Sequence, residues 1–212
     1  MILRKNFIYL TVLRIDICFS LCYYLYIKGK GDYRMNIWHD INSERIKVEN
    51  FDAVVEISKG SKMKYELDKE TGMLRLDRVL HTSTHYPANY GFIPRTYAPD
   101  GDPLDVLILC SERIEPMSLV ECYPIGVITM LDNGAADDKI IAIHSGDPTY
   151  NGYTDISQLP KHIFDEMVHF FSVYKMLENK TTVIDEAKGA DVAKGIVKDS
   201  IDRYKDLFVG DK

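Results

Sequence analysis

The central part of the chain consists of short apolar runs separated by turn residues. Between Phe51 and Ile143, runs rich in β-branched and aromatic residues alternate with clusters of Gly, Asp, Asn and Pro. Runs of this kind predict the strands of a mostly antiparallel sheet or closed barrel. The predicted strands are Ala53–Ser58, Met63–Leu67, Met73–Val79, Val106–Cys110, Leu119–Thr129 and Lys139–Ile143.

The C-terminal part of the chain follows a different period. From Ile163 to Leu177, apolar side chains recur at steps of three and four residues, and Pro160 suits the beginning of a helix. A second helix is predicted from about Ala190 to Phe208. Its apolar stripe comprises Val192, Ile196, Val197, Ile201, Tyr204 and Phe208. Helices that follow a strand-rich segment indicate an α+β fold, here a β-barrel flanked by two C-terminal helices.

Residues 1–34 fit neither pattern. The stretch 7–27 is apolar, but Arg14 and Asp16 lie in its middle, where each charge would cost a membrane span about 2.5–3.5 kcal/mol. A cleaved signal peptide is also disfavoured, because no small-x-small cleavage site follows the apolar stretch. We therefore expect residues 1–34 to be an extension outside the fold, with the natural start directly after it. Residues 35–212 then form a single domain, a length ordinary for one core.

Charge and cysteine usage restrict the classes of partner. The formal net charge of −6 argues against nucleic acid and membrane partners, which require a basic surface. An acidic protein that acts on an anionic substrate needs cations. The four cysteines contain no C-x-x-C pair and are not spaced with histidines as zinc ligands, so we expect reduced thiols and a cytoplasmic protein.

The segment Asp100–Asp105 carries the strongest chemical signal. It places three carboxylates in six residues around Gly101 and Pro103. Like charges at this spacing raise one another's pKa unless a cation lies among them. Magnesium is commonly bound by one or two carboxylates together with substrate phosphates. The plain alternative is a solvated acidic turn. A calcium loop of the EF-hand type is excluded, because its sixth position is Asp105 instead of Gly and its twelfth is Ser111 instead of Glu.

A second acidic segment, Asp132–Lys139, connects two predicted strands. By itself it is a polar turn. Two carboxylate clusters at strand ends, however, are able to converge and hold two metal ions about 3.5–4 Å apart. Neither cluster contains His or Cys, which disfavours zinc and favours magnesium or manganese.

The predicted strands also carry charges on faces that are normally apolar. Lys64 and Glu66 share one face of their strand, and Arg78 shares a face with Leu76. These charges point either into a cavity or to solvent along an edge strand. Tyrosines such as Tyr174 lie on apolar stripes, where most tyrosines simply belong to the core.

Together these segments resemble the soluble family I inorganic pyrophosphatases in their shorter bacterial form. Asp100–Val106 matches the family signature in full. Supporting matches are Val55–Ile57, Met63–Leu67, Leu76–Arg78, Tyr86–Phe92 and His169–Lys175. The resemblance implies a five-stranded OB-like β-barrel with flanking helices and a homohexamer. It also implies magnesium-dependent hydrolysis of pyrophosphate to two phosphates by direct attack of a metal-activated water. Several Mg²⁺ ions take part, with Mn²⁺ as a possible substitute.

The resemblance also implies roles for individual residues. Asp102 resembles the base that receives the proton of the attacking water. The implied metal ligands are Asp100, Asp105, Asp132 and Asp137. The implied phosphate-binding groups are Lys64, Arg78, Tyr90, Tyr174 and Lys175, and the supporting residues are Glu56, Glu66, Tyr86 and Lys139.

The chain departs from the family pattern at two places. After Lys175 the family usually has a strand that contains a Trp. This chain has no Trp there, so the presence of that strand is in doubt. The acidic connection also has Asn133 and Ala136 where a Glu is frequent. Two other functions stay open from the residues alone. One is an OB-fold module that binds oligonucleotides or sugars, and the other is an enzyme for a different phosphoanhydride, such as a nucleotide.

Overall fold

The computed structural model describes residues 35–132, 134–180 and 182–210. No helix within these ranges is long and apolar enough to cross a membrane. The expected extension 1–34 lies outside the described residues, so its separation from the fold stays a prediction.

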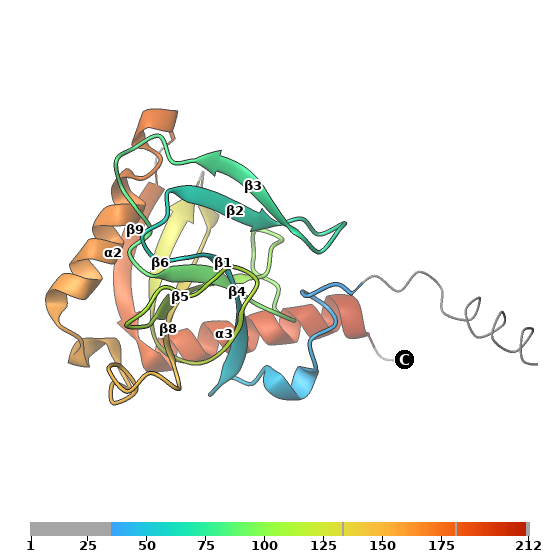
Figure 1. Cartoon of the computed structure of the whole chain (residues 1–212). Coiled ribbons are helices and arrows are strands. Elements are labelled where there is room, and N and C mark those ends of the chain that lie inside the picture. The colour runs from blue at the N-terminus through green and yellow to red at the C-terminus, as the bar shows by residue number, and fades with distance from the viewer. Residues whose placement is uncertain (1–34, 133, 181, 211–212) are drawn as a thin grey trace, which may run out of the picture. The chain divides into compact units, whose positions relative to one another are not determined.

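Five strands pair in a closed ring (Figure 1). The ring strands are β1 (Phe51–Ile57), β4 (Asn89–Ile93), β5 (Leu104–Leu109), β8 (Lys139–His144) and β6 (Leu119–Asp132). They pair in this order, and β6 pairs with β1 to close the ring. All of these pairs are antiparallel except β5 with β8, which is parallel. The predicted α+β, five-stranded OB-like arrangement with two C-terminal helices is therefore confirmed.

In the described ranges, four further strands lie outside the ring: two extend the sheet beside β6, and two form a separate hairpin. The short β7 (Ala135–Ala136) and β9 (Thr182–Gly189) both pair with β6. A separate hairpin is formed by β2 (Met63–Leu67) and β3 (Leu74–Val79). The strand after Lys175, which the missing Trp had put in doubt, is thus present.

The strand β4 was not predicted as a strand because Gly91 interrupts it and Pro94 follows it. Gly91 is required by close packing, since a Cβ atom there would lie 1.8 Å from the carbonyl oxygen of Val54 on the paired strand β1. The buried Asn89 fixes the start of the strand. Its side-chain oxygen accepts the backbone N–H groups of Lys59 and Ile114.

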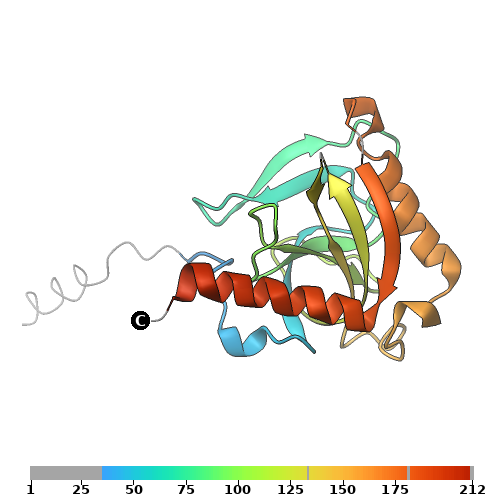
Figure 2. The same ribbon diagram turned by 180° about the vertical axis from the view of Figure 1, so that it is seen from behind.

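Two α-helices follow the ring strands, on different sides of it (Figure 2). The helix α2 spans Lys161–Val173 and α3 spans Ala190–Tyr204. Single turns flank the strands and helices: η1 (Ser43–Arg45), η2 (Ile156–Gln158), η3 (Met176–Glu178) and the π-helical η4 (Lys205–Val209). The predicted stripes are wrong at their ends, because Leu177 lies in η3 and is 66% exposed, and Val192 and Phe208 are also exposed. The buried face of α3 contains the predicted Val197, Ile201 and Tyr204, and Ala193 adds to it.

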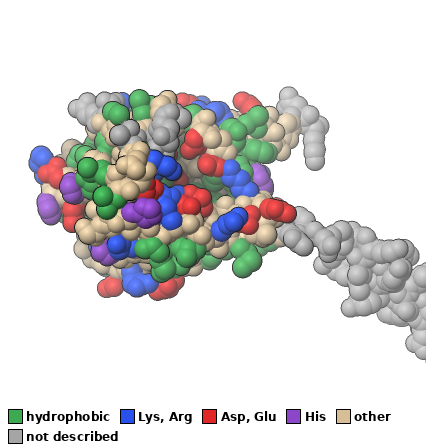
Figure 3. Space-filling view, turned by 90° about the horizontal axis from the view of Figure 1, so that it is seen from above, with side chains coloured by type: hydrophobic (Ala, Val, Ile, Leu, Met, Phe, Trp, Pro, Cys, Tyr) green, Lys and Arg blue, Asp and Glu red, His purple; other side chains and the backbone are tan. Residues whose placement is uncertain are grey.

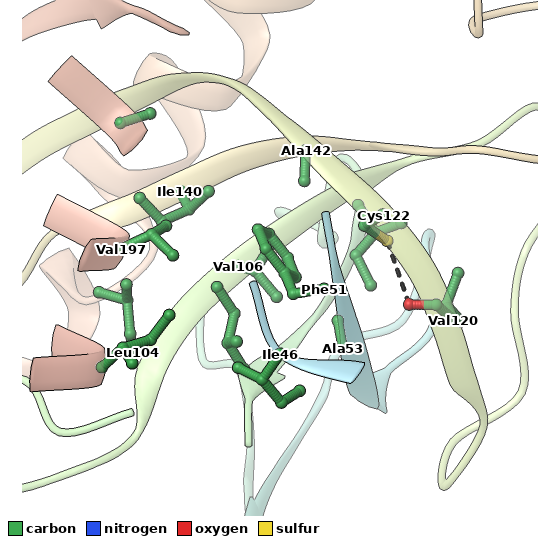
Figure 4. Packing of buried hydrophobic residues seen from close by; sticks show 14 of the residues in the cluster. Ile46, Phe51, Ala53, Leu104, Val106, Val120, Cys122, Ile140, Ala142 and Val197 are labelled. Carbon is green, nitrogen blue, oxygen red and sulfur yellow. Dashed lines mark hydrogen bonds between the residues drawn. The ribbon is translucent and has the colours of Figure 1, made fainter. Parts of the chain in front are cut away.

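The core consists of two clusters on opposite faces of the ring strands. Val106 and Ile140 belong to the cluster that packs against Val197 of α3 (Figure 4). Their neighbours Leu107 and Ile141 belong to the other cluster, which contains Met167, Phe170 and Phe171 of α2. Because successive side chains of a strand alternate between faces, β5 and β8 are buried on both sides. This packing fixes the register of the strands that carry the site.

Candidate active site

A cavity of about 640 Å³ lies between the β2–β3 hairpin and the ring. Its lining combines carboxylates, ammonium groups and tyrosines from segments far apart in the sequence. Of the residues expected from sequence, those that line it are Glu56, Lys64, Glu66, Tyr90, Asp100, Asp102, Asp105, Asp137, Lys139, Tyr174 and Lys175. On the face seen from above in Figure 3, acidic and basic side chains likewise lie side by side.

Lys139 joins the two acidic segments. The parallel register of β5 and β8 places Asp105 beside Lys139, and the buried ammonium group donates to both Asp105 and Asp137. Burial alone would lower the pKa of Lys139, but the two carboxylates outweigh burial and raise it. Lys139 therefore stays protonated and holds two otherwise repelling carboxylates together.

The carboxylates that line the cavity around Lys139 are not fully neutralised by its ammonium group. Burial raises the pKa of Asp105, Lys139 opposes the shift, and Asp137 adds to it. Burial and the neighbouring carboxylates likewise raise the pKa of Asp100. Burial and Asp105 raise the pKa of Glu56 to about 8, although Glu56 accepts the N–H of Leu67 at 2.7 Å. Added cations would relieve this repulsion.

The loop that carries Asp102 is fixed by its own backbone. The N–H of Ala98 donates to the carbonyl oxygen of Asp102 at 2.7 Å, and the N–H of Asp102 donates to the side chain of Asp100 at 3.1 Å. Gly101 has φ 89°, a left-handed conformation that favours glycine. The Asp102 side chain is 55% exposed and forms an ion pair with Lys69 from the hairpin turn. The loop thus presents Asp102 at the open side of the cavity.

The hairpin contributes cations that are held by carboxylates. Lys64 donates to Glu66 and lies 3.4 Å from Asp77. Arg78, the cross-strand partner of Lys64, does not itself line the cavity. Its guanidinium group donates to Asp77 and to Glu178.

Aromatic residues support the wall below these groups. Tyr86 is buried away from the cavity lining, and its ring packs 5.3 Å from that of Tyr90 and 4.8 Å from that of Phe170. The hydroxyl of Tyr90 lowers the pKa of Asp105 and so opposes the effect of burial. Tyr174 and the nearly buried Lys175 follow the end of α2, with the Lys175 ammonium 5.1 Å from the Tyr174 ring centre.

The donor set fits hard divalent cations. Asp100, Asp105 and Asp137 offer only carboxylate oxygens, the ligands that magnesium prefers. The side chain of Asp132 lies outside the described part of the chain. Among the described residues, no three carboxylate, imidazole or thiol groups are arranged to hold one ion as they stand. Lys139 and Lys69 instead supply the local positive charge.

A sequence model of the family described as inorganic pyrophosphatase matches residues 53–205. The chain belongs to this family. It is 50% identical over 172 residues to soluble inorganic pyrophosphatase 2 of Chlamydomonas reinhardtii, a match that covers 81% of this chain and 90% of that protein. It is 46% identical to soluble inorganic pyrophosphatase PPA1 of Solanum tuberosum, over 81% of this chain and 82% of that protein.

Solved structures of pyrophosphatases share the fold. The inorganic pyrophosphatase of Helicobacter pylori superposes with a TM-score of 0.73 at 40% identity, covering 76% of this chain and 96% of that chain. The enzyme of Thermus thermophilus gives 0.72 at 37% identity, covering 74% and 92%. The predicted family and enzyme class, inorganic diphosphatase, are therefore confirmed. Enzymes of this family use divalent metal ions.

Sequence reasoning missed several groups that the pyrophosphatase fold brings to the site. Lys69 and Arg75 line the cavity, but in the sequence they belong to a turn and a strand of ordinary composition. Asp77 was noted only as part of a matching segment. Glu178 pairs with Arg78 across 100 residues, and no local pattern indicates such a contact.

Proposed function

We propose that this chain hydrolyses inorganic pyrophosphate to two phosphates with the help of Mg²⁺. One observation carries the proposal: Asp105 and Asp137, from two separate acidic segments, meet at the buried Lys139 in the wall of one cavity. Cations from the hairpin and from the end of α2 line the same cavity. A cavity that combines hard-metal ligands with ammonium groups suits a small, highly anionic substrate.

Several Mg²⁺ ions, with Mn²⁺ as a substitute, would be held by Asp100, Asp105, Asp137 and Asp132. Bound there, such ions lower the pKa of water and neutralise charge on phosphoryl oxygens. Burial, and after it the neighbouring carboxylates, raise the pKa values of Asp100 and Asp105. These shifts support the assignment, because a divalent cation bound there would stabilise the charged carboxylates. The metal-binding carboxylates are supported by neighbouring side chains that do not bind the metal ions themselves: Glu56, Tyr86 and Lys139.

Asp102 is the proposed general base. Its carboxylate stands at the open side of the cavity, where water reaches it, and its loop is fixed by backbone hydrogen bonds. It receives the proton of the attacking water, a role that suits a carboxylate within hydrogen-bonding distance of that water. Lys69 from the hairpin turn pairs with Asp102 at this open side. Attack is direct, so the chain needs no serine or cysteine nucleophile.

The substrate phosphates are bound by cations and hydroxyls of the chain. Lys64, Lys175 and Arg78 stabilise the charge on the two phosphoryl groups, and Tyr90 and Tyr174 donate hydroxyl hydrogen bonds. Glu66 holds the Lys64 ammonium at the cavity. The homohexamer and the cytoplasmic location stay predictions, as does the absence of nucleic acid and membrane partners. Size-exclusion chromatography with light scattering tests the hexamer.

Phosphate release from pyrophosphate tests the function. We expect release at neutral pH with Mg²⁺, no release after chelation with EDTA, and recovery when Mg²⁺ or Mn²⁺ is restored. ATP serves as the competing phosphoanhydride. A purified, folded chain that releases no phosphate from pyrophosphate at saturating Mg²⁺, or that prefers ATP, contradicts the proposal.

A further inference from the structure

The guanidinium group of Arg78 is held by two carboxylates. Arg78 lies near the end of β3, and its Nε donates to Oε1 of Glu178 at 2.9 Å. Nη1 donates to Asp77. The end of β3 lies beside the end of α2 and the η3 turn, which carries Glu178, in both ribbon views (Figures 1 and 2). This ion pair therefore joins the hairpin to the segment that follows α2.

The pair between Arg78 and Glu178 is shielded from water. The side chain of Glu178 is 7% exposed and that of Arg78 is 20% exposed. Burial lowers the pKa of Arg78, but the hydrogen bond and the charge of Glu178 outweigh burial and raise it. A buried charged hydrogen bond of this kind is stronger and better defined in direction than a surface pair. Glu178 thus restricts the orientation of the guanidinium plane.

Glu178 is also tied to the cavity wall through its backbone. Its N–H donates to the carbonyl oxygen of Lys175 at 2.9 Å. Lys175 and Tyr174 line the cavity directly before this turn. The position of Arg78 is therefore coupled to two other proposed phosphate-binding groups.

One nitrogen of Arg78 has no acceptor in the part of the chain that the structure describes. Nε and Nη1 are both bonded, whereas Nη2 is buried and has no hydrogen-bond partner among the described residues. A buried donor without an acceptor destabilises the folded state, so its presence calls for an explanation such as a role in binding. Arg78 lies next to the cavity, because it is the cross-strand partner of Lys64, which lines it. A phosphoryl oxygen is the acceptor that suits this free donor.

We propose that Glu178 is a positioning residue for substrate binding. By accepting from Nε it holds Arg78 so that Nη2 is directed to a phosphoryl oxygen of the substrate. This inference rests on the proposed function, since it assigns Arg78 to the same site. Glu178 itself does not touch the substrate and acts only through Arg78.

Three variants test the inference: Glu178→Ala, Glu178→Gln and the control Glu166→Ala, which removes an exposed carboxylate of α2. We expect Glu178→Ala to raise the KM for magnesium pyrophosphate about tenfold while kcat changes much less, because a charge-assisted contact to Arg78 is lost. Glu178→Gln keeps an acceptor for Nε and is expected to recover most of the affinity. Glu166→Ala is expected to match the parent chain.

A double-mutant cycle separates positioning from a general structural effect. In an Arg78→Ala background, Glu178→Ala is expected to raise KM no further, because the side chain through which Glu178 acts is already absent. Additive effects, or an unchanged KM in Glu178→Ala, overturn the inference. If Glu178→Ala does not fold, Glu178→Asp replaces it, since the shorter side chain keeps the charge but withdraws from Nε. An unchanged KM in Glu178→Asp is then equally decisive against the inference.

Calorimetric binding of inorganic phosphate with Mg²⁺ separates this inference from the proposed function. If the parent chain binds phosphate but hydrolyses no pyrophosphate, the proposed function fails, and the phosphate affinities of the Glu178 variants still decide the positioning role. Weaker phosphate binding in Glu178→Ala than in Glu166→Ala upholds it, and equal binding overturns it.

Discussion

Replacing Lys139 by Met tests whether a buried ammonium group holds the two acidic segments together. Met is unbranched and similar in length, so it fills the same space without the charge. In the parent chain the ammonium donates to Asp105 and Asp137, and its side chain is 4% exposed. In the variant these two carboxylates face each other with no cation of the chain between them.

The size of the effect follows from burial. Removing one partner of a buried ion pair costs about 3–5 kcal/mol, because the remaining charge is left uncompensated. The side chains of Asp105 and Asp137 are 25% and 14% exposed, so water screens them in part. We therefore take the lower end, about 3 kcal/mol, which corresponds to a fall in unfolding temperature of roughly 6–12 °C for a domain of this size.

The pH dependence of the Lys139→Met effect distinguishes electrostatics from packing. Burial, opposed by Lys139 and reinforced by Asp137, already raises the pKa of Asp105, and loss of Lys139 raises it further. A carboxyl group whose pKa is raised in the folded state binds more protons there than in the unfolded chain, so stability falls as pH rises. The deficit of the variant is therefore expected to be largest near pH 7–8 and to shrink as pH falls towards 5 and the carboxyl groups protonate.

Urea unfolding without divalent ions, at pH 5 and pH 7.5, measures this prediction. Lys161→Met is the matched control, because Lys161 is 85% exposed and forms only a surface pair with Asp165. Two results would refute the reasoning: a Lys139→Met variant as stable as Lys161→Met at pH 7.5, or a deficit that does not depend on pH.

Three further predictions concern single residues of the cavity. Burial and Asp105 raise the pKa of Glu56 to about 8 from 4.5, so Glu56 costs the folded state increasing stability as pH rises between these values. In urea unfolding without metal ions, the free energy of unfolding of Glu56→Gln should therefore increase relative to that of the parent chain between pH 5 and pH 8. The same difference between variant and parent at both pH values would contradict this prediction. Asp102→Asn should lower kcat about a hundredfold or more in phosphate release with little change in the thermal unfolding temperature, because its side chain is 55% exposed; full turnover would remove Asp102 as the base. Lys64→Ala should raise KM about tenfold with a smaller change in kcat, and a substrate titration with normal KM would exclude Lys64 from phosphate binding.

Much of the fold was predictable because its signals are local. Runs of β-branched residues bounded by turns predicted six strands, and all six are present, β2 with the predicted bounds and the other five with shifted ends. The change of period after Pro160 predicted α2 and α3. The strand β4 was missed because Gly91 makes its sequence look irregular, although the tight packing on β1 is what requires glycine there. Leu177 and Phe208 were wrongly assigned to the buried stripes because η3 and η4 take the chain off the α-helical path. Val192 lies within α3 but on its exposed side.

The sequence by itself determined the chemistry available to the site: dense carboxylates at two strand ends, cations on a hairpin, and tyrosines around a family signature. Only the tertiary structure decided which of these groups meet. The parallel pairing of β5 with β8 sets Asp105 beside Lys139, and the folding of η3 against β3 sets Glu178 beside Arg78. Local periodicity encodes which face of a strand is apolar, whereas pairing partners depend on burying both faces of the ring strands at once. Contacts across 34 and 100 residues therefore follow from the packed core and not from any local pattern.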